Sequence, residues 1–192
     1  MKQTIKSIAI IAIAAFITIS FSGILDGKIE IKADKSTLTW KGYKVTGSHT
    51  GTLVVKSGSL TFKNDKLTDG EFVIDMASLI STDLEGEYKG KLEGHLKSDD
   101  FFGVEKHPTA TLLFKKVTAT GKNSYSVTGD LTIKGKTNKI DFDLSVYGRK
   151  ANATLKIDRS KYGVKYGSSS FFEGLKDKVI YDDFDLIADL EF

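Results

Sequence analysis

Apolar and polar residues alternate with a period of two along most of the chain after Ala33. This alternation is typical of β-strands that have one face in a core and the other face in water. Short polar segments rich in Gly, Asn, Asp, Lys and Ser separate most of these runs and are typical of turns, including a predicted turn at "KSGS", residues 56–59. The pattern predicts about eight strands, in residues 36–45, 51–62, 71–76, 109–117, 124–135, 139–148, 151–158 and 183–192.

The strict alternation also predicts how the strands are arranged. One dry face and one wet face are typical of antiparallel strands, whereas buried parallel strands have continuous apolar runs. Eight long strands of this kind can close into a barrel, which removes the exposed edges of the sheet. A barrel of this size has room for packed side chains or for one small ligand. We therefore expect an all-β fold, an eight-stranded antiparallel barrel, with a two-sheet sandwich as the alternative.

One segment, residues 77–97, breaks the period of two and predicts a short helix. Its apolar residues recur at every fourth position, as on one face of a helix: Leu84, Tyr88, Leu92 and Leu96. Asp83 precedes this stripe, as a helix N-cap would. Glycines at 86, 90 and 94 weaken a helix by about 1 kcal/mol each relative to alanine, and would permit a close backbone approach. A glycine-rich loop is the alternative.

A polar loop that carries two adjacent aromatic rings follows the helical segment. Phe101 and Phe102 come directly after Lys97, Ser98, Asp99 and Asp100. Together with the helical segment, this loop is the one long connection between two predicted strands, and long connections are often lids or binding loops. We expect the two rings at an end of the barrel, pointing into its mouth. They could close over a ligand or simply plug the barrel.

The candidate ligand-binding residues are large apolar side chains of the predicted inner faces, of the helical stripe and of the aromatic loop. They are Trp40, Phe62, Phe72, Ile74, Leu84, Tyr88, Leu92, Leu96, Phe101, Phe102, Leu112, Phe114, Leu131, Ile133, Phe142 and Leu144.

The N-terminus differs from the rest of the chain. Lys2 and Lys6 precede a run of 19 uncharged residues, Ser7–Leu25. This is typical of a signal peptide over residues 1–22, which small residues at 20 and 22 support, and the mature domain would then span 23–192. The run is also close to the length of about 20 residues that a membrane span needs, so an uncleaved anchor is the alternative. We expect export to a bacterial periplasm.

Composition excludes several classes of function. The chain contains no cysteine, which excludes disulfides, thiolate metal sites and a lipid-modified N-terminal cysteine. Of 28 basic and 25 acidic residues, the predicted leader removes Lys2 and Lys6 and no acid, which leaves a net charge of +1. A nearly neutral domain gives no electrostatic case for binding nucleic acid. Whether the protein is a monomer or a dimer is not determined by the sequence.

No motif predicts catalysis, a cofactor or a metal. The three histidines, His49, His95 and His107, are spaced unlike a short metal-binding motif, although His49 and His95 could meet at one end of the barrel. The chain has no G-x-S-x-G elbow. Arg159 could hold a loop through backbone carbonyls or meet a polar head group, and its donors suit both roles.

Three stretches of the sequence resemble one family. "HLKSDDFFGVEKHPTATLLF", residues 95–114, is similar to the signature of the YceI-like proteins. "YSVTGDLTIKGKTNKIDFDLSV", residues 125–146, resembles the stretch that follows it in that family, and "IDRSKYG", residues 157–163, resembles its arginine–aromatic–glycine loop. The resemblance covers roughly residues 32–192. It departs from the family pattern at the glycine-spaced segment 84–96 and at residues 166–179.

The resemblance implies a lipocalin-like barrel with an elongated apolar tunnel that holds a polyisoprenoid, an isoprenoid quinone or a related long-chain lipid. The two departures put the head group and the length of the lipid in doubt. We therefore expect an exported lipid-binding barrel without catalysis and without a cofactor, with a short helical lid. An enzyme, or a stress-response module with a filled interior, remains the alternative on the same barrel.

Overall fold

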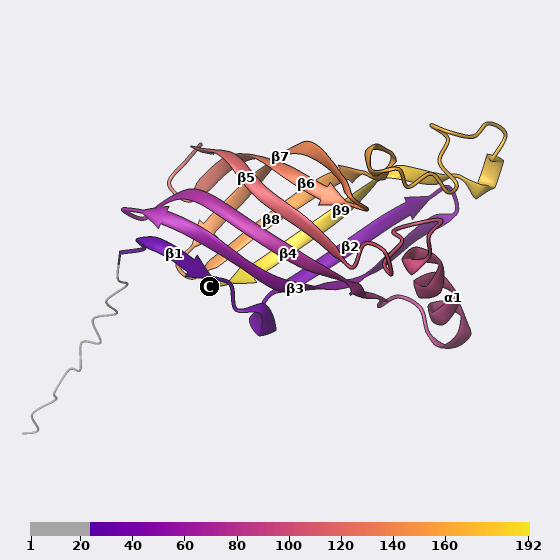
Figure 1. The fold of residues 1–192 in the computed structure, drawn as a ribbon, viewed down its shortest axis with the longest axis horizontal. Coiled ribbons are helices and arrows are strands. Elements are labelled where there is room, and N and C mark those ends of the chain that lie inside the picture. Colours follow the sequence, from indigo (N-terminus) through magenta and orange to yellow (C-terminus); the bar gives the residue numbers. More distant parts are fainter. Residues whose placement is uncertain (1–23) are drawn as a thin grey trace, which may run out of the picture.

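In the computed structural model of the protein, residues 24–192 are described (Figure 1). The predicted signal peptide, residues 1–22, lies outside the described residues. Within them, no helix is both long enough and apolar enough to cross a membrane.

Eight antiparallel strands, β2–β9, form a closed barrel in the described part of the chain (Figure 1). Each strand pairs with its neighbour, β9 pairs with β2, and β3 pairs with β4. Because the ring has no free edge, the barrel is confirmed over the sandwich. The strands are β2 (Thr37–Lys44), β3 (Gly47–Lys63), β4 (Lys66–Ser81), β5 (Thr109–Ala119), β6 (Ser124–Ile133), β7 (Lys136–Tyr147), β8 (Lys150–Asp158) and β9 (Ile180–Glu191).

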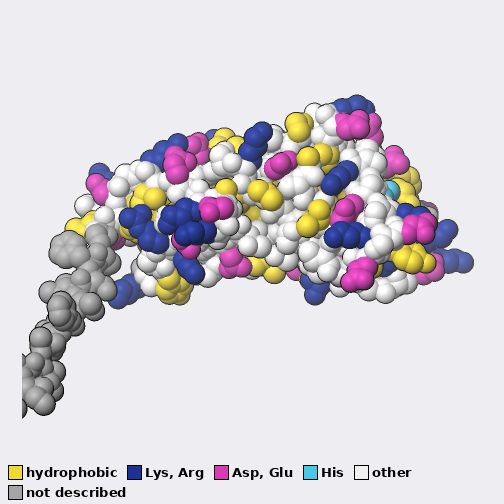
Figure 2. Space-filling model, turned by 90° about the horizontal axis from the view of Figure 1, so that it is seen from below, with side chains coloured by type: hydrophobic (Ala, Val, Ile, Leu, Met, Phe, Trp, Pro, Cys, Tyr) yellow, Lys and Arg dark blue, Asp and Glu magenta, His cyan; other side chains and the backbone are white. Residues whose placement is uncertain are grey.

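The predicted alternation corresponds to the inner and outer faces of the barrel. In β7, Ile140, Phe142, Leu144 and Val146 are buried, while the residues between them face outward. Figure 2 shows one flank, where Lys, Arg, Asp and Glu side chains surround scattered hydrophobic ones. The core inside the barrel is therefore built from the apolar member of each alternating pair, as the sequence predicts.

Two features of the sheet differ from the prediction. A short strand, β1 (Gly27–Glu30), was not expected and adds to the edge of β3. The predicted turn at "KSGS" is wrong, because β3 runs through these residues and accommodates them with a register shift between Val55 and Ser57. The reversal into β4 lies at Asn64 and Asp65, in the polar segment between two predicted strands, and their φ angles of 50° and 63° allow this tight turn.

The predicted helix is confirmed as α1, Gly86–Lys97. Its start differs from the prediction: Glu85 is the N-cap residue and makes no side-chain cap bond. Asp83 instead accepts hydrogen bonds from Ser81 Oγ and from the backbone N–H of Thr50. The glycines of α1 serve no close approach, because no heavy atom lies within 4 Å of an added Cβ at residues 86, 90 or 94.

The barrel has two different ends. At the far end lie β1, the β3–β4 turn and the C-terminus. At the lid end lie α1, the loop 98–108, the tip of the β2–β3 hairpin and the loop 163–179 (Figure 1). Short 3-10 helices occur at Ala33–Lys35, Arg159–Tyr162 and Lys176–Lys178.

Candidate ligand-binding site

An apolar cavity opens at the lid end of the barrel. The volume of the cavity is about 140 Å³. This is roughly ten times the volume that one water molecule needs. Its walls are inward-facing residues of the barrel strands, and its cover is α1 and the loop 98–108. The wall residues include Trp40, Leu53, Ile74, Met76, Leu79, Ala110, Leu131, Ile133, Ile157, Phe184 and Leu186.

Phe101 and Phe102 lie against this cavity, as predicted. They are only 5% and 9% exposed, and their rings meet edge to face at 5.0 Å. Phe102 also approaches Phe184 of β9, with ring centroids 6.4 Å apart. A backbone hydrogen bond from Phe102 N–H to Leu96 O and a side-chain hydrogen bond from Lys134 Nζ to Phe101 O hold the loop in place. The rings therefore face the cavity and at the same time pack as core residues.

Three buried phenylalanines pack in the barrel interior beyond the residues that line the cavity, and we call them the aromatic floor: Phe72, Phe114 and Phe142. The ring of Phe114 lies 5.9 Å from that of Phe72 and 5.7 Å from that of Phe142. Gly70 makes room for Phe114, because an added Cβ would lie 2.6 Å from its ring. Between the floor and the far end the interior is packed with side chains, including a stacked pair, Phe62 and Phe192, at 5.4 Å.

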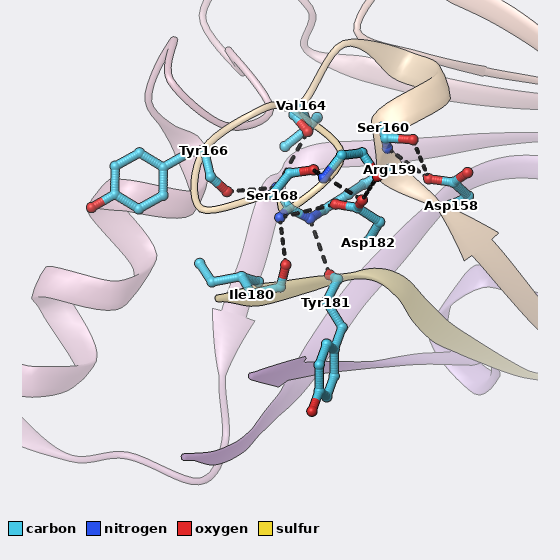
Figure 3. Close-up of polar contacts among 10 residues, drawn as sticks. Asp158, Arg159, Ser160, Val164, Tyr166, Ser168, Ile180, Tyr181 and Asp182 are labelled. Carbon is cyan, nitrogen blue, oxygen red and sulfur yellow. Dashed lines mark hydrogen bonds and ion pairs between the residues drawn. The ribbon is translucent and has the colours of Figure 1, made fainter. Parts of the chain in front are cut away.

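Arg159 is the charged group most deeply buried at the cavity, and it is already paired (Figure 3). It donates to the carbonyls of Val164, Tyr166, Ile180 and Tyr181, and Asp182 lies 3.3 Å from its Nη2. Burial lowers the pKa of Arg159, and the charge of Asp182 opposes that shift. Arg159 therefore has the structural role foreseen for it, which is to hold the loop 163–179 on β9.

His95 lines the cavity and carries a buried polar atom without a partner. Its Nε2 is buried and makes no hydrogen bond. Its ring lies edge-on between Phe101, at 5.7 Å, and Tyr166, at 4.3 Å. His49 also lines the cavity, but its Nδ1 is paired with Asp83 at 2.8 Å. The two histidines thus reach the same end of the barrel, and within residues 24–192 no group of three metal-binding side chains forms.

The sixteen candidate residues fall into three groups. Eight of them line the cavity: Trp40, Ile74, Leu92, Leu96, Phe101, Phe102, Leu131 and Ile133. Six lie elsewhere in the barrel interior, in the aromatic floor or beyond it: Phe62, Phe72, Leu112, Phe114, Phe142 and Leu144. Two lie outside: Leu84 precedes α1, and Tyr88 is 74% exposed.

The error at Tyr88 has a geometric cause. A strict four-residue period drifts by about 40° per step on a helix of 3.6 residues per turn. If Leu96 faces the barrel, then Tyr88 points about 80° away from it. The apolar stripe of α1 is therefore short and consists of Leu92 and Leu96.

Several lining residues were not among the candidates. Leu53, Met76, Ile157, Phe184 and Leu186 are on predicted inner faces, so the alternation already contained the signal for them. Tyr43 and Lys44 lie where β2 shifts register against β9, between Gly42 and Lys44. An irregularity of this kind has no signature in a pattern of period two.

The fold and the cavity define an antiparallel barrel with an apolar cavity under α1. Residues 29–192 match the model of the YceI-like domain. The chain belongs to the YceI-like family.

Relatives of known sequence or structure agree with this assignment. A UPF0312 protein of Pseudomonas putida is 30% identical over 156 residues, which cover 72% of this chain and 76% of the relative. BcnA of Burkholderia cenocepacia has a similar fold, with a TM-score of 0.66 at 21% identity, over 83% of this chain and 98% of BcnA. A polyisoprenoid binding domain from Saccharophagus degradans has a TM-score of 0.60 at 17% identity, over 88% and 97% of the two chains.

Proposed function

We propose that the protein holds one lipid with an isoprenoid or similar long apolar tail in the cavity under α1, and that it does so without catalysis. The observation that carries this proposal is a cavity with almost wholly apolar walls, whose most deeply buried cation, Arg159, is already paired. Ligand sites of this composition suit apolar molecules with few polar groups. The Saccharophagus neighbour, described as a polyisoprenoid binding domain, supports the same class of ligand.

The energy for binding comes from burying the tail. Each CH₂ removed from water contributes about 0.8 kcal/mol, so ten carbons contribute about 8 kcal/mol before the ordering costs of binding. A metal or a charged contact is not needed for this affinity.

The aromatic floor sets how deep the tail reaches. The interior between Phe72, Phe114, Phe142 and the far end is filled with side chains. A tail that enters from the lid end therefore stops at the floor, and the elongated tunnel implied by the family resemblance is shortened to the outer half of the barrel.

The polar end of the lipid would lie near His95. A buried nitrogen without a partner costs about 1–3 kcal/mol, which a hydrogen bond from the ligand would recover. Because the charge of Arg159 is already paired with Asp182, a neutral head such as an alcohol or a quinone carbonyl fits this site better than a phosphate. The charged leader pattern at Lys2 and Lys6 supports action in the periplasm after removal of residues 1–22.

Filling the cavity tests this function. Ala110 is buried on the cavity wall, so Ala110→Phe places a ring in the ligand's space. Ala119 lies at the exposed far end of the same strand, and Ala119→Phe is the matched control. We expect the affinity for a C15 isoprenoid alcohol, followed by fluorescence competition, to fall at least tenfold in Ala110→Phe and to stay unchanged in Ala119→Phe. Equal affinity in both variants, at unchanged thermal stability, would contradict a ligand in this cavity.

A further inference from the structure

Aromatic side chains stand exposed around the mouth of the cavity. The segment 163–179, which we call the mouth loop, carries Tyr166, Phe171 and Phe172, and Tyr181 follows it at the start of β9. These four side chains are between 43% and 50% exposed. Large apolar groups gathered on a surface mark a site of interaction more often than chance.

The mouth loop is held in one position, so the exposure of its rings is not the result of fraying. Arg159 donates to the carbonyls of Val164 and Tyr166 inside the loop (Figure 3). Ser168 is buried and its hydroxyl donates to Asp182, which also pairs with Arg159. Phe171 N–H and Phe172 N–H both donate to Ser168 O. This network presents the two phenylalanines to the solvent on a fixed support.

The tip of the β2–β3 hairpin extends the same surface. Val45 is 51% exposed, and its N–H donates to Val179 O of the mouth loop at 3.2 Å. Lys44 pairs with Ile180 across the β2–β9 ladder. The hairpin tip and the mouth loop therefore form one continuous face, which we call the mouth face.

The mouth face is basic. Hairpin residues 41–50 contribute Lys41 and Lys44 and no acid, and the mouth loop contributes Lys165, Lys176 and Lys178 against Glu173 and Asp177. Five lysines and two acids leave a net charge of +3, which Asp185, opposite Lys41 in the β2–β9 ladder, reduces to +2. Lys165 Nζ lies 5.0 Å from the centre of the Phe171 ring, so cation and aromatic ring are presented together.

The mouth face also continues into the cavity. Tyr181 and Lys44 line the cavity as well as the surface, and Tyr166 packs on His95 of α1. A tail that left a bilayer beside these residues would reach the apolar walls without crossing water. Crossing water would expose the apolar tail, which is unfavourable.

We propose that the mouth face docks on an anionic lipid bilayer and holds the cavity against the membrane for exchange of its ligand. Aromatic rings concentrate at the interface between lipid head groups and acyl chains. Lysines near an anionic surface strengthen binding to it, and salt weakens this attraction. Exchange of a ligand during docking rests on the proposed lipid-binding function. The docking itself depends only on the residues of the mouth face.

Vesicle flotation tests the docking. All described strands and core residues lie after residue 23, so a chain that starts at Gly23 contains the whole described barrel without the apolar leader. We expect this chain to float with vesicles of phosphatidylcholine and phosphatidylglycerol in equal parts, to float less in high salt, and to stay behind with pure phosphatidylcholine. Phe171→Ser together with Phe172→Ser should weaken binding to the mixed vesicles at least tenfold.

A matched control separates the mouth face from exposed apolar residues in general. Leu113 on the barrel wall and Tyr147 at the far end are 43% and 58% exposed, close to Phe171 and Phe172. Leu113→Ser together with Tyr147→Ser should leave vesicle binding unchanged. Equal losses in both double variants, or no binding of the starting chain to mixed vesicles, would overturn the docking.

A second measurement keeps the docking distinct from the function of the cavity. The affinity of both double variants for a C15 isoprenoid alcohol in solution should equal that of the starting chain, because neither phenylalanine lines the cavity. Vesicle binding without alcohol binding would support the docking and contradict the lipid cavity. A third outcome is that the starting chain binds the alcohol, fails to bind vesicles and forms a dimer in ultracentrifugation. If Phe171→Ser together with Phe172→Ser abolished that dimer, the mouth face would be assigned to contact with a second copy of the chain.

Discussion

At the residue scale, Arg159 shows how one side chain connects the barrel to its mouth. Its guanidinium is 2% exposed and joins four backbone carbonyls from the mouth loop and the start of β9. Carbonyls in an irregular segment have no strand partner, so a buried fork of donors can satisfy several of them at once. Sequence alone left a choice between this role and a head-group contact, because the donors of arginine suit either role.

We predict that Arg159→Met destabilises the protein by about 3–5 kcal/mol, the range for removing one partner of a buried ion pair. Asp182 and the four carbonyls would lose their shared donor. Arg149→Met is the control, because Arg149 is exposed at the far end and should change stability by less than about 0.5 kcal/mol. Urea unfolding measures both. A loss as small as the control's would mean that water replaces the arginine in this loop.

At the element scale, the strands were predictable and the lid was predictable only in part. The alternation in β7 and its neighbours fixes inner and outer faces, because a shift of one residue would turn every apolar side chain to water. In α1 the four-residue recurrence identified a helix but not which of its residues meet the barrel. That choice depends on where the helix starts, at Gly86, and on the hydrogen bond from Ser81 N–H to Glu93 at its inner side.

We predict that Phe101→Ala together with Phe102→Ala lowers both stability and lipid affinity. The rings are buried, so the loss should be at least about 3 kcal/mol, as for other core phenylalanines. They also cover the ligand, so the affinity for an isoprenoid alcohol should fall. Thermal unfolding of the lipid-free protein and a binding titration measure the two effects.

The control for this pair is another pair of adjacent phenylalanines. Phe171 and Phe172 are about half exposed, so replacing both with alanine should leave stability and affinity for the dissolved alcohol nearly unchanged. If Phe101→Ala and Phe102→Ala reduced stability but kept full affinity, the rings would be a plug and not a lid.

The aromatic floor makes a separate prediction about chain length. Phe114→Leu removes part of the floor and should deepen the cavity, so that about two more CH₂ groups are buried, worth about 1.6 kcal/mol or roughly tenfold in affinity. The preference for a C20 over a C10 isoprenoid alcohol should rise accordingly. Phe62→Leu makes the same change beyond the floor, next to Phe192, and should leave the preference as it was. An unchanged preference in Phe114→Leu would show that the tail does not reach the floor.

At the scale of the whole molecule, the closed barrel followed from the sequence and the cavity did not. Eight alternating strands with no continuous apolar run predict an antiparallel fold, for which a barrel was expected and a sandwich was the alternative. Whether its interior is empty or filled depends on the volumes of side chains that meet across the barrel. Phe72, Phe114 and Phe142 fill one level, while Ala110, Ile74 and Leu131 leave space at the next, and these contacts between distant residues have no period in the sequence.

The central claim is that this cavity holds a lipid, and native mass spectrometry of protein produced in a bacterium and purified without detergent tests it most directly. We predict one added mass per chain in the range of a long-chain lipid. This mass should be absent from Ala110→Phe and retained in Ala119→Phe. A spectrum of the bare chain alone, from folded protein in all three samples, would contradict the account and favour a barrel whose interior serves only its own stability.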